Sequence, residues 1–213
     1  MNRRLFAWSG LVLVLTTLGY AARASDGEPP RDALYRYDSF VAGLVQYALI
    51  LLVVLAIARG HEGLLALRRP SSWKRVLGYS ALVLVVTYAA AAAVESFADP
   101  GREQGLLPDG WDSSRALPFA LNFALVAAVA PVAEELAFRG LGYSLLARYG
   151  RVLAIVAVGL AFGLVHGLLE ALPILAVFGA GLALLRERTG SVLPSIGVHA
   201  LFNAVALVLA VTT

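Results

Sequence analysis

The residues best suited to chemistry are ionisable side chains set inside apolar segments. The stretch PVAEELAFRG, residues 131–140, holds Glu134, Glu135 and Arg139 between long apolar runs. Arg139 follows Glu135 by four residues, so on a helix the two side chains share a face and can pair. Glu134 projects about 100° away from Glu135. The spacing is equally compatible with a stabilising Glu135–Arg139 ion pair and with a catalytic one, and it places Glu134 on another face.

A histidine lies at a matching depth on the next predicted helix. Glu134 precedes the turn near Gly150 by 16 residues, and His166 follows it by 16. In an antiparallel hairpin, equal offsets place both side chains about 24 Å of helix from the turn. We expect Phe162 to pack and shape the pocket beside His166. A ladder of small residues should allow close helix approach, and it consists of Gly159, Gly163 and Gly167.

The last apolar segment contributes His199 and Asn203, four residues apart on one helix face. A carboxylate and an imidazole at one depth can hold a water whose proton the carboxylate accepts. His199 and Asn203 are suitable donors for the oxyanion that forms when water adds to a carbonyl. The set therefore predicts amide hydrolysis without a covalent nucleophile.

Other uses of this set of residues stay open. Glutamate and two histidines could hold zinc with a free fourth position, although no HExxH motif is present. We favour a metal-free, cofactor-free water activation, with zinc as the alternative. Buried glutamate, arginine and histidine could instead form the relay of a proton- or cation-coupled carrier, but no internal repeat is visible. A non-catalytic membrane scaffold is the third alternative.

The composition predicts the elements that must position these residues. The chain is 60% hydrophobic and 15% charged, with a mean hydropathy of +0.79. A soluble domain is closer to half apolar and a quarter charged. We therefore predict an all-α, polytopic transmembrane helical bundle in a lipid bilayer. The absence of cysteine excludes thiol chemistry and disulfides. The net charge of +3 comes from arginines clustered in short loops, which indicates membrane topology and no nucleic-acid partner.

About seven spans are expected, at roughly 5–22, 39–58, 76–97, 116–148, 152–169, 171–186 and 191–211. Placing the basic loops in the cytoplasm puts the N-terminus there as well. The 116–148 segment would form roughly 50 Å of helix, more than a bilayer needs. We expect Pro131 to kink or restart this helix, which would put Glu134 and Glu135 in a first turn.

The chain divides into three parts on this reading. Residues 1–25 form a first transmembrane helix or a signal-like segment, because a basic start precedes an apolar run long enough to span. Residues 26–115 form further membrane helices and loops without motifs. Residues 116–213 form the catalytic core.

Three motifs in this core resemble the signature of a known family. They are Glu134-Glu135-x-x-x-Arg139, Phe162-x-x-x-His166 and His199-x-x-x-Asn203, each in a hydrophobic segment. Their order is similar to that in the CPBP family of intramembrane proteases, also called the CAAX protease and bacteriocin-processing, or Abi, family. The resemblance covers roughly residues 115–210.

The resemblance implies a helical bundle that encloses the site in a cavity. Carried over to this chain, Glu134 and His166 would activate water, His199 and Asn203 would stabilise the oxyanion, and Glu135 and Arg139 would support the first motif. The implied substrate is a membrane-anchored or lipidated protein or peptide, with C-terminal processing or sorting as one form of the reaction. The arginine- and alanine-rich chain looks bacterial, so we expect it in the inner (plasma) membrane.

Overall fold

The computed structural model describes residues 2–27, 30–104, 108 and 110–212, and this part of the chain is helical without strands. Apolar runs form the long helices, because a helix satisfies its own backbone polar groups in lipid. They are α1 (Asn2–Asp26), α2 (Tyr37–Ala58), α3 (Trp73–Glu95), α8 (Arg151–Leu164), α9 (Leu172–Thr189) and α10 (Leu193–Thr212), with the short α4 (Pro100–Gln104) after α3.

Between α4 and α8 the chain forms one long, nearly continuous helix. It consists of α5 (Ala116–Ala124), the π-helical η4 (Leu125–Val129), α6 (Ala130–Glu135), the π-helical η5 (Leu136–Gly142) and α7 (Tyr143–Leu146). A short 3-10 turn, Ala147–Tyr149, ends it, and Gly150 at φ +136° turns the chain into α8. Counting this composite helix as one, the described residues form seven main helices at the positions of the seven predicted spans, although not all of them are long and apolar enough to cross a bilayer.

Five helices of the described chain are long and apolar enough to cross a bilayer: 3–25, 37–58, 73–95, 113–149 and 193–212. At 14 residues, α8 is shorter than a full span. Large apolar side chains point outward from the bundle, among them Leu13 (66% exposed) and Leu77 (73% exposed). In a water-soluble protein such exposure over many helices would be costly. The predicted polytopic helical bundle is confirmed.

The predicted break at Pro131 is not observed. The backbone stays in the right-handed helical region from Ala124 to Tyr143, so no new helix begins at the proline. The π-helical turn before it removes the conflict. Pro131 cannot donate a backbone hydrogen bond, and η4 widens the helix so that the Ala130 N–H bonds to the Leu125 carbonyl, five residues back. Glu134 and Glu135 therefore do not lie in the first turn of a new helix.

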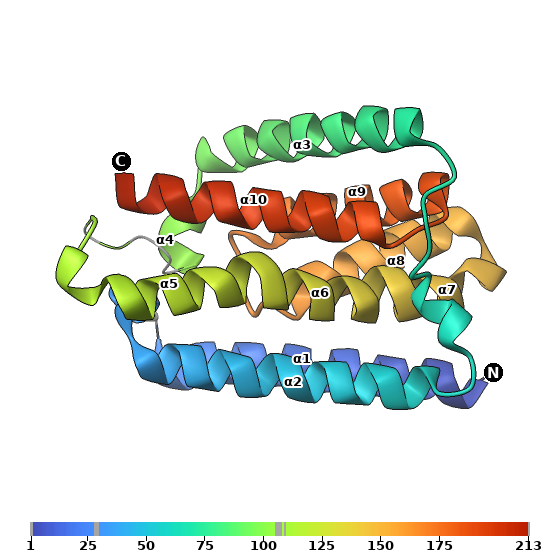
Figure 1. Cartoon of the computed structure of the whole chain (residues 1–213), viewed down its shortest axis with the longest axis horizontal. Coiled ribbons are helices and arrows are strands. Elements are labelled where there is room, and N and C mark those ends of the chain that lie inside the picture. Colours follow the sequence, from blue (N-terminus) through green and yellow to red (C-terminus); the bar gives the residue numbers. More distant parts are fainter. Residues whose placement is uncertain (1, 28–29, 105–107, 109, 213) are drawn as a thin grey trace.

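The helices pack in layers (Figure 1). Helices α1 and α2 lie together on one side, the α5–α7 helix follows with α8, and α9 and α10 separate it from α3. The N-terminus, the α2–α3 connection and the turn before α10 lie at one end of the bundle, and the C-terminus lies at the other.

Small residues set the closest contacts in this packing. A Cβ on Gly159 would lie 2.7 Å from the Ala180 nitrogen, and one on Gly163 would lie 2.8 Å from Leu172 Cδ1, so the predicted ladder packs α8 against α9. Its last member, Gly167, lies beyond α8 at φ +67° and meets Gly19 of α1. The ladder therefore does not pair α8 with the α5–α7 helix.

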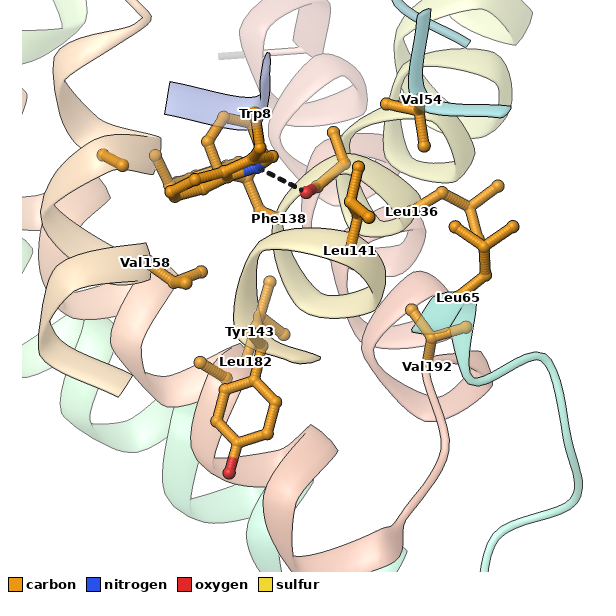
Figure 2. Packing of buried hydrophobic residues seen from close by; sticks show 14 of the residues in the cluster. Trp8, Val54, Leu65, Leu136, Phe138, Leu141, Tyr143, Val158, Leu182 and Val192 are labelled. Atoms are coloured by element: carbon orange, nitrogen blue, oxygen red, sulfur yellow. Dashed lines mark hydrogen bonds between the residues drawn. The ribbon is translucent and has the colours of Figure 1, made fainter. Parts of the chain in front are cut away.

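Trp8 of α1 fixes the second π-helical segment. Its Nε1 donates a 2.9 Å hydrogen bond to the Ala137 carbonyl, and its ring covers Gly142 and packs edge-on against Phe138. Figure 2 shows this contact at the centre of the buried core. Because η5 begins directly after Glu135, Trp8 holds the backbone that carries the first motif.

Candidate active site

Four predicted catalytic residues line one cavity of about 430 Å³. Glu134 comes from α6, His166 from the turn after α8, and His199 and Asn203 from α10. Aromatic rings form much of the remaining wall, including Phe162, Phe178 and Phe202. The tertiary structure therefore brings the three motifs to one enclosed volume.

Glu135 and Arg139 form the expected pair, and both side chains are 0% exposed. Arg139 Nη1 donates to Glu135 Oε1 at 2.6 Å, and Nη2 donates to the Gly179 carbonyl of α9 at 3.0 Å. The guanidinium carbon lies 4.2 Å from the centre of the Phe162 ring. Neither Glu135 nor Arg139 lines the cavity. The pair therefore supports the cavity-lining residues from the buried interior of the bundle.

His199 lies between the two glutamates. Its Nδ1 is 2.9 Å from Glu135 Oε1, and its Nε2 is 3.7 Å from Glu134 Oε2. Phe162 and Phe178 pack edge-on against the imidazole, with centroids 5.6 and 5.4 Å away. The ring is thus fixed in plane and in rotation, and Nδ1 must carry a hydrogen to donate to Glu135.

Glu134 is the glutamate that is open to a substrate. Its side chain is 13% exposed, against 0% for Glu135. It lines the active-site cavity and also a second cavity of about 740 Å³ between α1 and α2. The Tyr47 hydroxyl of α2 interacts with this carboxylate.

His166 lies just beyond α8, in a turn, and is half-buried. Its Nδ1 is 2.6 Å from the Phe162 carbonyl oxygen, which can only accept, so Nδ1 is the protonated nitrogen. In the neutral ring Nε2 is then left as an acceptor. His166 lines the same two cavities as Glu134, which agrees with the depth match counted from Gly150.

Asn203 is oriented by the π-helical turn before Pro131. In η4 the Ala130 N–H is used by Leu125, and the next donor along would be Pro131, which has none. The Val126 carbonyl therefore lacks a backbone partner, and Asn203 Nδ2 donates to it at 2.9 Å. One amide hydrogen of Asn203 is occupied by this bond, and the second is free for a ligand in the cavity.

Tyr47 and Arg23 are polar lining residues that come from helices without motifs. Tyr47 of α2 lines both cavities, and Arg23, near the end of α1, lines the active-site cavity with its Nη1 buried and without a hydrogen-bond partner. Sequence reasoning missed both. The only available signals were a polar Gln46-Tyr47 pair in an apolar run and a single arginine at a helix end.

Zinc, the alternative to a metal-free site, would need Glu134, His166 and His199 to converge on one point. Across the described ranges, no three His, Asp or Glu side chains are grouped so that they could hold a metal. The Nδ1 atoms of His166 and His199 are occupied by a carbonyl and by Glu135, which leaves Nε2 of each ring as the nitrogen available to a ligand. Zinc sites need three protein ligands converging on one point, and we derive no step through a metal.

An all-helical bundle with outward apolar faces and a cavity lined by ionisable side chains defines a class: a polytopic membrane protein with a polar site. Residues 116–205 match the family model described as type II CAAX prenyl endopeptidase Rce1-like. The matched segment is a little under half of the chain and contains all three motifs.

This match confirms the resemblance to CPBP-type CAAX proteases. The protein is a peptide hydrolase integral to a membrane. CAAX proteases, which it resembles, act on membrane-anchored proteins. No curated protein and no solved structure was found to match the chain.

Proposed function

We propose that this protein is a glutamate-dependent intramembrane endopeptidase that processes or sorts a membrane-anchored or lipidated protein near its C-terminus. One observation carries the proposal. Glu134, His166, His199 and Asn203 share a cavity, whereas their buried supports, Glu135 and Arg139, lie outside it. The groups that line the cavity are thus those that the reaction needs.

Water activation falls to Glu134 and His166. A water between them donates one proton to the Glu134 carboxylate. Its other O–H donates a hydrogen bond to His166 Nε2. The Phe162 carbonyl keeps that nitrogen unprotonated by holding the ring hydrogen on Nδ1. Proton transfer to Glu134 accompanies attack of the water oxygen on the substrate carbonyl.

His199 and Asn203 stabilise the resulting oxyanion. With Nδ1–H directed to Glu135, His199 needs a second proton to donate from Nε2. Nε2 lies 3.7 Å from Glu134 Oε2, so it faces the same part of the cavity as the catalytic carboxylate. The free amide hydrogen of Asn203 is the second donor, and the Val126 bond fixes its direction.

Collapse of the tetrahedral intermediate breaks the C–N bond. Glu134 returns its proton to the leaving nitrogen, which departs as a neutral amine, and the carbonyl carbon retains the water oxygen as a new carboxyl group. The cycle consumes one water and needs no covalent enzyme intermediate.

The second cavity supports a substrate that arrives from the lipid. Its lining from α1 and α2 is almost entirely apolar, and lining residues such as Val14, Val45 and Leu49 are more than half exposed. It ends at Glu134 and His166. A membrane-embedded or lipid-modified segment therefore has an apolar route to the catalytic groups. We propose a bacterial inner membrane as the location.

The test is to replace Glu134→Gln and His166→Ala in the source cell and to score membrane proteins by mass spectrometry. We expect both variants to accumulate unprocessed substrates while the protein level stays normal. Normal processing by both folded variants would refute the protease mechanism. For the metal-free step, activity should survive strong chelation, and elemental analysis should find no stoichiometric zinc; loss of activity that zinc restores would contradict it.

A further inference from the structure

A buried arginine at the basic end of the bundle has no counter-ion. Arg186, in the last turn of α9, is only 6% exposed. Within the part of the chain that the structure describes, its guanidinium donates no hydrogen bond, and its Nε is fully buried. Buried charges are normally paired, because an unpaired ion loses its hydration without compensation.

The nearest carboxylate is already occupied. Glu187 accepts from the Tyr143 hydroxyl and forms a 3.1 Å ion pair with Arg151. Arg186 instead lies over the Tyr143 ring, 5.5 Å from its centre. The charged group acting most strongly on Arg186 is another cation, Arg68. In the described part of the chain neither Arg68 nor Arg186 forms an ion pair with a carboxylate; Glu187 attracts Arg186 only from a distance.

The fold prevents Arg68 from moving away. Its Nε donates to the Gly190 carbonyl at 2.7 Å, and its own carbonyl accepts from the Ser191 hydroxyl. Two backbone bonds extend this connection, from Ser71 to Thr189 and from Val192 to Ala66. Figure 2 shows the loop with Leu65 and the segment with Val192 lying against each other. The 59–75 loop is thus fastened to the α9–α10 turn.

The surroundings indicate what kind of anion is missing. Further cations lie nearby in the sequence: Arg69 in the same loop, Lys74 and Arg75 in the first turn of α3, and Arg188 in the last turn of α9. In the predicted topology this end faces the cytoplasmic leaflet, where anionic lipids attract basic pockets between helices. Guanidinium forks match the oxygens of a phosphate group.

We propose that Arg68 and Arg186 bind a phosphate anion, which at the membrane surface is that of an anionic phospholipid headgroup. The site is separate from the catalytic cavity and does not depend on the proposed reaction. Bound lipid would anchor the α9–α10 turn, which precedes the helix that carries His199 and Asn203.

The experiment compares the full chain with Arg186→Met, which keeps the side-chain volume but removes the charge. Thermal unfolding is measured in neutral maltoside detergent, with and without phosphatidylglycerol, phosphatidylcholine or inorganic phosphate. In neutral detergent we expect Arg186→Met to be at least as stable as wild type, because it lacks an uncompensated charge. Phosphatidylglycerol should raise the Tm of wild type only, and phosphatidylcholine should raise neither.

Native mass spectrometry supplies the affinity. Loss of one charged hydrogen-bonding group corresponds to about a tenfold weaker phosphatidylglycerol binding or more, and this is expected for Arg68→Gln and Arg186→Met. The matched control is Arg69→Gln, an exposed arginine next to Arg68, which should change binding by less than about twofold.

Equal weakening in the control, or unchanged binding in Arg186→Met, overturns the site. If inorganic phosphate binds but phosphatidylglycerol does not, the anion is not a lipid headgroup. If wild type is more stable than Arg186→Met without any anion, the protein itself satisfies the Arg186 guanidinium and the site is overturned.

Discussion

Two adjacent glutamates contact the two nitrogens of one imidazole. Glu135 Oε1 is 2.9 Å from His199 Nδ1, and Glu134 Oε2 is 3.7 Å from Nε2 of the same ring. Neighbouring residues on a helix point about 100° apart, and the ring of His199 fits between them. The buried member of the pair orients the histidine, and the exposed member faces the cavity.

Replacing each glutamate by glutamine should therefore impair catalysis in one variant and stability in the other. Glu134→Gln should lower kcat by about 10²–10⁴-fold, because it removes the general base, and should leave the Tm near that of wild type. Glu135→Gln should instead lower the free energy of unfolding by about 3–5 kcal/mol, because it leaves Arg139 buried without its partner. Peptidase assays and thermal unfolding in detergent measure both. Equal loss of stability in the two variants would contradict this division.

Asn203→Ala should reduce kcat by about 10²–10³-fold, the usual effect of losing an oxyanion donor. It should also cost about 1–3 kcal/mol, because the Val126 carbonyl loses its partner. Asn122→Ala is the matched control. That amide donates to the Leu34, Arg36 and Pro118 carbonyls, away from the cavity, so it should lose stability but keep activity per folded molecule.

Trp8→Phe tests how α1 holds the first motif. The substitution keeps an aromatic ring but removes the hydrogen bond to Ala137. We expect a loss of about 0.5–1.5 kcal/mol of stability and a lower kcat with little change in KM, since the backbone between Glu135 and Arg139 is loosened. A variant with wild-type kcat would show that η5 is held without α1.

Gly159→Ala should destabilise the α8–α9 contact by about 1–3 kcal/mol, because its Cβ would lie 2.7 Å from the Ala180 nitrogen. Gly10→Ala is the control in another membrane helix, where a Cβ meets nothing within 4 Å. It should be neutral or stabilising by up to about 1 kcal/mol, because alanine favours helix. Denaturant or thermal unfolding of both variants measures the two changes in stability.

The loop before α5 should respond to acid. The Ser114 hydroxyl and then the Arg115 guanidinium lower the pKa of Asp112 from 3.8 to about 2. A lowered folded-state pKa means that this carboxylate stabilises the loop above pH 3.8 and loses the contribution as the pH falls through 2. NMR titration of the Asp112 carboxyl carbon should give a midpoint near 2. A midpoint near 3.8 would show that the Ser114 and Arg115 contacts do not form in solution.

The sequence by itself determined the class of fold and the chemical groups. Long apolar runs that must satisfy their own backbone in lipid leave only helices, and a four-residue spacing was sufficient to pair Glu135 with Arg139. Counting from Gly150 also placed Glu134 and His166 at one depth, because helical rise is constant.

Only the tertiary structure decided how these groups are used. Local spacing could not reveal that His199 lies between two glutamates from a distant helix. It also could not reveal that Tyr47, on a helix without a motif, interacts with the Glu134 carboxylate. It also gave the wrong result at Pro131, where we expected a break. A π-helical turn absorbs the missing donor there, and a side chain 77 residues away, Asn203, satisfies the carbonyl it exposes. That hydrogen bond depends on packing between helices, which no single segment encodes.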